Sequence, residues 1–307
     1  MNAIEVSQVS YRYGRVTALR DVDLAVPDGA LYALLGPNGS GKTTLLQILM
    51  GLRRAVSGRA TILGVDAAHL GARDRARVGY VAEGQTLPGW MRLAQLEAYL
   101  APLYATWDAQ LADELRDRFA LDPARRIRTL SRGERMKAAL LCALAPRPRV
   151  LVMDEPFTGM DALVKDDLVR GLLGSSGAEG CTILLCSHDI GELELLADWV
   201  GFLDHGAVRL SAPMERVREE FTRVEVALPD DRAIGAIPPE WMLAESAGRR
   251  MGFVLRADSH AAAERTVRAR LGETADIRLS DVSLREVFVA LASKRGVQQR
   301  PETGAAA

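Results

Sequence analysis

Apolar and polar residues alternate near the start of the chain, and continuous apolar runs follow. Residues 4–9 alternate between apolar and polar side chains, and residues 22–26 repeat this pattern before the turn at 27–29, so both segments are predicted to be half-buried strands. Residues 31–35 form a continuous apolar run that ends in glycine, which is typical of a strand buried on both faces.

Helical spacing begins after this run. A helix is predicted from about Gly41 toward Gly51, which suits a helix C-terminus, and residues 90–121 carry apolar and charged side chains at helical spacing. The apolar runs at 150–153 and 182–186 are predicted to be buried strands, each preceded by a helix. Strands that alternate with helices predict an α/β fold with a mainly parallel sheet and right-handed crossovers.

The pattern changes after about residue 215, where a small α+β unit is predicted. Its predicted elements are strands at 224–228, 252–255 and 276–279 and helices at 261–271 and 283–292. We therefore expect a first domain at 1–215, a second domain at 216–295 and a flexible polar tail at 296–307.

Composition is ordinary for a globular protein of 307 residues, with 48% hydrophobic and 26% charged residues. The balance of 39 Lys+Arg against 40 Asp+Glu argues against a basic surface for nucleic acid as the main feature, so no nucleic-acid partner is expected. Cys142, Cys181 and Cys186 sit in apolar runs without metal-binding spacing, which favours buried thiols in a reducing compartment.

No apolar stretch approaches the ~20 residues needed to cross a bilayer. The first residues contain neither a basic region nor an apolar signal segment. The expected location is therefore the cytosol, unless another chain holds the protein at a membrane.

The segment Gly36–Thr43 reads Gly-Pro-Asn-Gly-Ser-Gly-Lys-Thr and fits the phosphate-loop pattern between a strand and a helix. Its backbone N–H groups and the helix N-terminus favour phosphate, Lys42 is predicted to reach the β- and γ-phosphates, and the Thr43 hydroxyl is predicted to ligate Mg²⁺. The alternative is a glycine-rich turn that only joins the two elements. The predicted ATP-binding residues are Gly36, Pro37, Asn38, Gly39, Ser40, Gly41, Lys42, Thr43 and Thr44.

A second part of the same site is predicted where the apolar run at 150–153 ends in Asp154 and Glu155. Asp154 is expected to hold Mg²⁺ through water, and Glu155 to act as general base on the attacking water. Taken alone, this pattern fits a strand that simply reaches solvent. The functional interpretation of Asp154 and Glu155 depends on their combination with the phosphate loop.

Residues 130–134 read Leu-Ser-Arg-Gly-Glu and begin a helix that is predicted to run to Pro146. Ser131 and Glu134 have the spacing of a capping box. The segment also resembles the Leu-Ser-Gly-Gly-Gln signature of the ATP-binding cassette family, in which the serine and the helix N-terminus face a γ-phosphate bound by the opposite subunit. The resemblance implies that Ser131, Gly133 and Glu134 contact nucleotide, and both interpretations can hold together.

Further motifs follow the order of that family over about residues 3–210. Asp161 resembles the acid of the D-loop, and His188 resembles the switch histidine that contacts the γ-phosphate. Tyr13 resembles the aromatic residue that stacks on adenine. Taken alone, His188 fits a helix start and Tyr13 fits a surface strand.

Three positions depart from the family pattern. Glu83 stands where the family usually has a glutamine that touches Mg²⁺, and nearby Gln85 leaves that assignment open. Because a carboxylate also ligates Mg²⁺, Glu83 joins Thr43 and Asp154 as a predicted metal residue. Arg132 replaces a glycine of the signature, and Glu134 replaces its glutamine.

The resemblance implies a P-loop NTPase of the ABC ATPase type. This type has a mainly parallel core sheet, an antiparallel N-terminal β subdomain and a helical subdomain, here at about 88–146. It also implies a homodimer or heterodimer that encloses two ATP molecules, and separate membrane permease subunits that dock near Glu83 and residues 90–121. Glu83 and the segment 282–288 resemble ATPases of bacterial exporters, so we expect an export ATPase at the cytoplasmic face of a bacterial membrane.

Three alternatives remain at this stage. In the first alternative, the chain is a soluble cassette ATPase that acts on the ribosome or on DNA. In the second, it is a switch GTPase or a small-molecule kinase that uses the same loop. In the third alternative the second domain is a ligand sensor, for which the sequence offers no convergent polar cluster.

Overall fold

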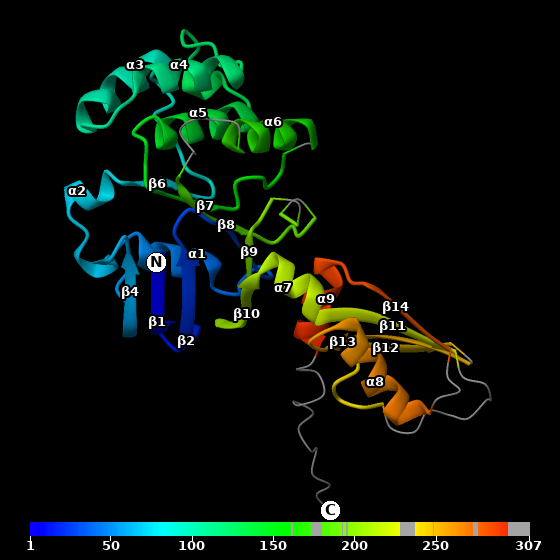
Figure 1. Cartoon of the computed structure of the whole chain (residues 1–307). Coiled ribbons are helices and arrows are strands. Elements are labelled where there is room, and N and C mark those ends of the chain that lie inside the picture. Colours follow the sequence, from blue (N-terminus) through cyan, green and yellow to red (C-terminus); the bar gives the residue numbers. More distant parts are fainter. Residues whose placement is uncertain are drawn as a thin grey trace, which may run out of the picture. The chain divides into compact units, whose positions relative to one another are not determined.

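The computed structural model describes residues 1–160, 162–173, 180–191, 193–194, 196–227, 237–247, 249–272 and 276–293 (Figure 1). The chain divides into two compact units. The first holds Met1–Asp189 and Leu196–Ser211, and the second holds Ile190–Leu195 and the chain from Ala212 onward. The domain boundaries expected from the sequence, and the helical subdomain, stay predictions.

An antiparallel sheet forms the N-terminal part of the first unit. Its strands are β1 (Asn2–Tyr13), β2 (Val16–Pro27), β4 (Ser57–Ile62) and β5 (Val65–Asp66), in the order β2-β1-β4-β5. The alternating segments predicted as strands lie in β1 and β2, and their apolar side chains are buried. The sequence pattern does not predict β4, because its first three residues are exposed.

A second sheet of the first unit carries the phosphate loop. Its strands are β10 (Ala207–Pro213), β9 (Trp199–Asp204), β3 (Leu31–Leu35), β8 (Thr182–Ser187), β7 (Val150–Asp154) and β6 (Val78–Val81), in that spatial order. β3, β8, β7, β6 and β9 pair in parallel, which confirms the predicted α/β fold. Because β3, β7 and β8 run in one direction, the loops that follow them meet at one edge of the sheet.

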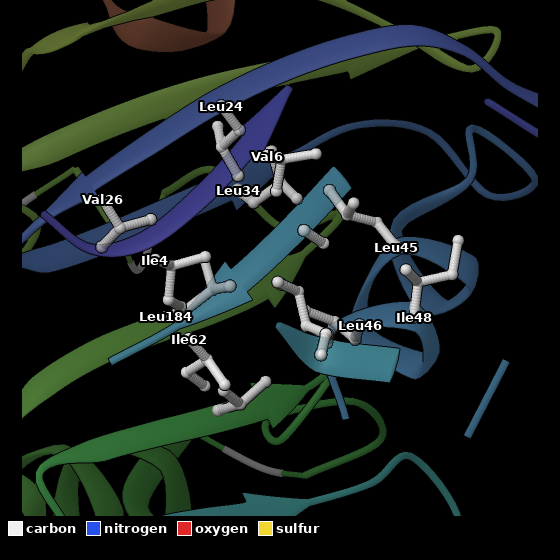
Figure 2. Close-up of a cluster of buried hydrophobic side chains, with 14 of the residues drawn as sticks. Ile4, Val6, Leu24, Val26, Leu34, Leu45, Leu46, Ile48, Ile62 and Leu184 are labelled. Atoms are coloured by element: carbon white, nitrogen blue, oxygen red, sulfur yellow. The ribbon is translucent and has the colours of Figure 1, made fainter. Parts of the chain in front are cut away.

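One apolar core joins these two sheets to helix α1 (Lys42–Leu49). Figure 2 shows α1 side chains beside residues of both sheets; the labelled ones are Ile4, Val6, Leu24, Val26, Leu34, Leu45, Leu46, Ile48, Ile62 and Leu184. Leu45 and Leu46 are fully buried, so α1 cannot turn about its axis without exposing apolar surface. This packing fixes the first turn of α1, where the phosphate loop ends.

The other helices of the first unit lie along residues 67–173. They are α2 (Ala72–Arg75), α3 (Leu93–Leu100), α4 (Ala109–Arg118), α5 (Arg132–Leu144) and α6 (Ala162–Leu173), with 3₁₀ turns at Ala67–His69, Ala101–Leu103 and Ile127–Thr129. The helical prediction for 90–121 is confirmed as α3 and α4. Helix α5 ends at Leu144 rather than at the predicted Pro146, whose ring removes a backbone donor.

The second unit is a four-stranded antiparallel sheet with helices. Its elements are α7 (Met214–Glu220), β11 (Phe221–Ala227), β12 (Met242–Ala247), β13 (Arg250–Arg256), α8 (His260–Leu271), β14 (Asp276–Asp281) and α9 (Leu284–Ser293), and the strand order is β12-β13-β11-β14. Alternate residues of β11 and β13 pack with Ala263 and Val267 of α8. The predicted elements are confirmed; residue 228 and the predicted tail lie outside the described residues.

The three cysteines are free thiols. Cys181 and Cys186 are buried as predicted, whereas Cys142 is half-buried. Burial raises the pKa of the Cys186 thiol well above its ordinary value. These thiols therefore behave as small apolar side chains.

Candidate nucleotide-binding site

Glycine is required at several positions of the loop between β3 and α1. Gly39 and Gly41 have φ angles of +79° and +111°, in the region that favours glycine. A Cβ atom on Gly41 would lie 2.7 Å from the Ala18 carbonyl oxygen, and one on Gly36 would collide with the carbonyl oxygen of Leu203. The curled backbone of the loop thus requires glycine at positions 36 and 41, because a side chain there would collide with the neighbouring backbone.

Lys42 begins α1 and directs its ammonium group back into the loop. Its Nζ donates to the carbonyl oxygen of Gly36 at 2.7 Å and to that of Pro37 at 3.3 Å. Nζ also lies 3.3 Å from Oε1 of Glu155, and both side chains are only 6% exposed. A buried lysine of this kind provides a positive charge at the position where a phosphate-binding loop needs one.

Glu155 follows β7 and is held from several sides. Its Oε2 accepts from the Thr158 hydroxyl at 3.1 Å and lies 2.7 Å from Nδ1 of His188. Because a carboxylate accepts hydrogen bonds, His188 donates through Nδ1, and its Nε2 remains for another partner. The structure thus brings together the three predicted catalytic residues, Lys42, Glu155 and His188.

Asp154 ends β7 as a buried carboxylate, 1% exposed. Neither of its oxygens accepts a hydrogen bond of ordinary geometry from the described part of the chain. Burial raises the pKa of Asp154, the nearby Thr43 hydroxyl lowers it, and the charges of Glu83 and Glu155 raise it further. A cation beside Asp154 and Thr43 would remove this desolvation penalty, so these residues fit Mg²⁺.

The other candidate metal residues differ in their surroundings. Glu83 is close enough to act on the Asp154 carboxyl, whereas the Gln85 side chain accepts from the backbone N–H of Ala82 at 3.2 Å. Across the described ranges, no three His, Cys, Asp or Glu side chains gather as a metal-binding group. A Mg²⁺ ion here would therefore depend on Thr43, Asp154, water and phosphate oxygens for its ligands.

Tyr13 ends β1 beside α1. Its hydroxyl lies 3.3 Å from the Thr44 hydroxyl, one residue beyond Thr43, and the side chain is 42% exposed. The Arg53 guanidinium lies over the Tyr13 ring. An exposed aromatic ring near the phosphate loop is available for stacking on a base.

The signature segment forms a complete capping box at the start of α5. The Ser131 hydroxyl accepts from Glu134 N at 3.1 Å, and the Glu134 carboxylate accepts from Ser131 N at 2.6 Å. Glu134 also pairs with Arg125, and the backbone N–H of Ser131 is the first cause that lowers the pKa of Glu134. The capping interpretation is confirmed, while contact of Ser131, Gly133 and Glu134 with nucleotide stays a prediction.

Two further positions fix this helix start against the segment after β7. A Cβ atom on Gly133 would lie 2.7 Å from Cγ1 of Val164 in α6, and a Cβ atom on Gly159 would collide with the Arg132 guanidinium. Arg132 therefore covers a glycine with φ +70°. Asp161, the predicted D-loop acid, lies outside the described residues.

Sequence reasoning misses several residues of the site. Thr158 supports Glu155, Arg125 pairs with Glu134, and Arg53 covers Tyr13. No motif marks Arg53 or Arg125, because each meets its partner through the fold. Of the three, Thr158 gives a weak signal, since it lies three residues after Glu155 in the loop that follows β7.

A glycine-rich loop between a buried strand and a helix, beside an acidic strand end, defines a P-loop NTPase. Residues 19–158 match the family described as ABC transporter. Residues 19–158 therefore carry the sequence of this family's ATP-binding domain, and the fold agrees with that of a solved ABC transporter ATP-binding subunit.

Individual relatives agree with this assignment. The sulfate/thiosulfate import ATP-binding protein CysA of Synechococcus elongatus is 37% identical over 218 residues, which cover 69% of this chain and 63% of the relative. The ABC transporter ATP-binding protein YtrB of Bacillus subtilis is 27% identical over 228 residues, covering 74% and 78%. A solved ATP-binding subunit of an ABC transporter superposes with a TM-score of 0.64 at 26% identity, covering 70% and 92%. The chain thus spans slightly less than two thirds of the CysA relative.

Proposed function

We propose that this chain binds ATP with Mg²⁺ at Gly36–Thr43 and hydrolyses it as the ATP-binding subunit of a membrane transporter. One observation carries the proposal: the buried Glu155 carboxylate lies between Lys42 Nζ at 3.3 Å and His188 Nδ1 at 2.7 Å, beside the phosphate loop. These contacts support the roles proposed here for Glu155 as general base, His188 as its orienting partner and Lys42 as the phosphate-binding cation.

The loop and its lysine have the binding role. Backbone N–H groups of the glycine-rich turn and of the first turn of α1 surround the phosphate position, and Lys42 adds a mobile positive charge. Lys42 exchanges part of its contact with Glu155 for phosphate oxygens, which frees the carboxylate to accept a proton. Bound Mg²⁺ supplies positive charge that stabilises the phosphate oxygens, and Thr43 and Asp154 are the residues that would hold it.

Glu155 has the base role. Its Oε2 is fixed by Thr158 and His188, so Oε1 is the oxygen that faces Lys42 and the reaction centre. There it accepts a proton from the attacking water. His188 keeps the carboxylate oriented through Nδ1 and has Nε2 available for the γ-phosphate.

Replacement of Glu155 by glutamine tests the proposal. The amide oxygen keeps an acceptor for His188 but cannot take a proton at neutral pH, so phosphate release from MgATP should slow by roughly 10²–10⁴-fold, the usual loss for a general base. ATP affinity, measured by titration calorimetry, should remain within a few-fold of the wild-type value. The control is Glu215→Gln in α7, an exposed carboxylate outside the site. Wild-type turnover by Glu155→Gln would remove Glu155 from this role.

A second chain is proposed to complete each site. The phosphate loop and the signature helix α5 each occur once here, and in the resembling family the two meet across a subunit pair. Ser131 and Gly133 of one protomer would then contact the γ-phosphate held by Lys42 of its partner. Because hydrolysis removes the shared phosphate contact, nucleotide state would set the balance between closed and open pairs.

Membrane permease subunits are the proposed partners. Trp90, Tyr99 and Leu103 are 71%, 59% and 61% exposed, and all three belong to the short stretch around α3. Exposed aromatic and aliphatic side chains so close together in sequence favour a protein–protein contact. No helix among the described residues is long and apolar enough to span a membrane. If the chain bound RNA or DNA with a strong salt dependence and bound no permease, the alternative of a soluble cassette ATPase would be favoured.

The direction of transport has two candidates. Glu83 and the segment 282–288 resemble exporter ATPases, whereas the relative from Synechococcus elongatus is named as an import protein for sulfate and thiosulfate. We retain export as the first candidate. Uptake of labelled sulfate by cells that produce the chain with its permease, lost in Glu155→Gln, would decide for import.

A further inference from the structure

One face of the Tyr13 ring is already occupied by a cation of the same chain. Cζ of Arg53 lies 4.8 Å from the Tyr13 ring centroid and 5.7 Å from that of Tyr11. The two tyrosine rings meet edge to face, with centroids 5.0 Å apart and planes at 74°. Tyr13 is thus packed by a guanidinium and by a second ring, although it is 42% exposed.

Arg53 is anchored in this position by neutral groups. Its Nη1 donates to the Tyr11 hydroxyl at 3.1 Å, and its Nε donates to the Gln47 side chain in α1. The hydrogen bond to Tyr11 raises the pKa of Arg53 further, so the guanidinium stays charged at every working pH. No acidic partner of Arg53 occurs in the described part of the chain. The residue is therefore held by hydrogen bonds and ring contact rather than by an ion pair.

The ring is also tied to the phosphate loop. The Tyr13 hydroxyl lies 3.3 Å from the Thr44 hydroxyl, and Gln47, which accepts from Arg53, lies one turn further along α1. Helix α1 thus holds Tyr13 at its hydroxyl and, through Arg53, at its ring face. These contacts set the distance between the ring and the phosphates that the loop binds.

We propose that Arg53 is a positioning residue for base recognition: it packs on one face of Tyr13 and thereby holds the opposite face ready to stack on the purine of ATP. This inference rests on the proposed function. Ordering the ring before binding lowers the entropy lost when the base arrives. Arg53 contributes to recognition of the base and leaves the binding of the triphosphate unchanged.

The test compares two probes on the full chain, MgATP and inorganic tripolyphosphate with Mg²⁺, by titration calorimetry. Arg53→Ala should weaken MgATP binding by roughly 2–5-fold, the effect of an exposed cation–π contact, and leave tripolyphosphate binding unchanged. Arg53→Lys should fall in between, because it keeps the charge but loses the planar fork. Tyr11→Phe, which removes only the anchoring hydroxyl, should give a smaller loss in the same direction.

The matched control is Arg54→Ala, which removes the same charge at the next, exposed position. It should change neither affinity. Equal weakening of both probes by Arg53→Ala would mean that the residue acts on phosphate, and stronger MgATP binding would mean that it covers the face the base needs; either result overturns the inference. If only Tyr13→Ala affects MgATP, the inference fails and the stacking role of Tyr13 stands. If neither Arg53→Ala nor Tyr13→Ala changes the ratio of the MgATP affinity to the tripolyphosphate affinity, the stacking role of Tyr13 fails as well. The hydrolysis part of the proposed function is tested separately by Glu155→Gln.

Discussion

At the scale of single residues, the site concentrates charge in a place from which water is largely excluded. Asp154 is 1% exposed and lies near two other carboxylates, Glu83 and Glu155. In the protein without ligand this arrangement opposes ionisation, and it becomes favourable when a cation is present. The residue is therefore placed for binding at the expense of stability, as expected of a functional site.

Asp154→Asn should accordingly make the ligand-free protein more stable near pH 8. Burial raises the pKa of Asp154 in the folded state, so the ionised carboxylate destabilises the fold above that pKa and the penalty disappears below the unfolded value of about 3.9. The melting temperature of the variant should exceed that of the wild type by a few degrees at pH 8, since about 1 kcal/mol shifts Tm by roughly 2–4 °C at this size. The difference should shrink as the pH falls toward 4.

Thermal unfolding at several pH values measures this effect. The control is Asp117→Asn on the exposed side of α4, which should give no such pH-dependent gain. A variant that melts at or below the wild-type temperature at pH 8 would contradict the argument. Affinity for Mg²⁺ with ATP should fall in Asp154→Asn, because a carboxylate next to the metal position is lost.

Residues of the site could be predicted from sequence where they lie in one contiguous motif. The loop Gly36–Thr43 and the strand end at Asp154 and Glu155 are such motifs, and the ion pair of Lys42 with Glu155 brings them together. Arg53 could not be predicted, because its ring contact depends on how the end of α1 approaches β1. A motif of consecutive residues can be recognised from sequence alone. A contact between two elements cannot, because it depends on how all of the side chains between them pack.

At the scale of secondary-structure elements, Ser131 at the start of α5 has one structural role and one proposed functional role. The Ser131 hydroxyl caps the helix by accepting from Glu134 N, and it is the atom proposed to meet a phosphate of the partner subunit. Ser131→Ala should destabilise the protein by about 1 kcal/mol, whereas Ser131→Asp should keep the cap, since aspartate is an equally good N-cap residue. Urea unfolding measures both effects.

A second capped helix provides the comparison. Ser259 accepts from Ala262 N at the start of α8, so Ser259→Ala should cost a similar free energy of unfolding without changing the ATPase rate. Ser131→Ala and Ser131→Asp should both lower that rate. If Ser131→Asp were as active as the wild type, the hydroxyl would have only its capping role.

Continuous burial made three strands of the core sheet predictable from sequence. The strands β3, β7 and β8 are buried at every position, so an apolar run marks each of them. The strands β4 and β12 each expose three residues and resemble loops in their pattern. β4 pairs with β1, which is distant in sequence, so this pairing is not encoded locally. β12 pairs with β13, the strand that follows it in the chain.

At the scale of the whole molecule, the proposed active site belongs to two chains, so its parts can be disabled separately. Lys42→Ala removes the cation proposed to bind phosphate, and Ser131→Asp places a carboxylate at the position proposed to face the γ-phosphate while keeping the helix cap. Each variant alone forms pairs in which both sites are damaged, and neither should hydrolyse ATP at an appreciable rate. A mixed pair has one site with both defects and one site with none.

Mixing the two inactive variants should therefore restore hydrolysis. With equal amounts and random pairing, half of the pairs are mixed and each has one intact site, so up to about a quarter of the wild-type rate should return if the two sites act independently. Phosphate release measured against the mixing ratio should be greatest at equal amounts, and wild-type chain diluted with Lys42→Ala alone serves as the control for pairing. A mixture as inactive as its components, at concentrations where the wild type pairs and is active, would mean that Lys42 and Ser131 do not complete each other's site across two chains.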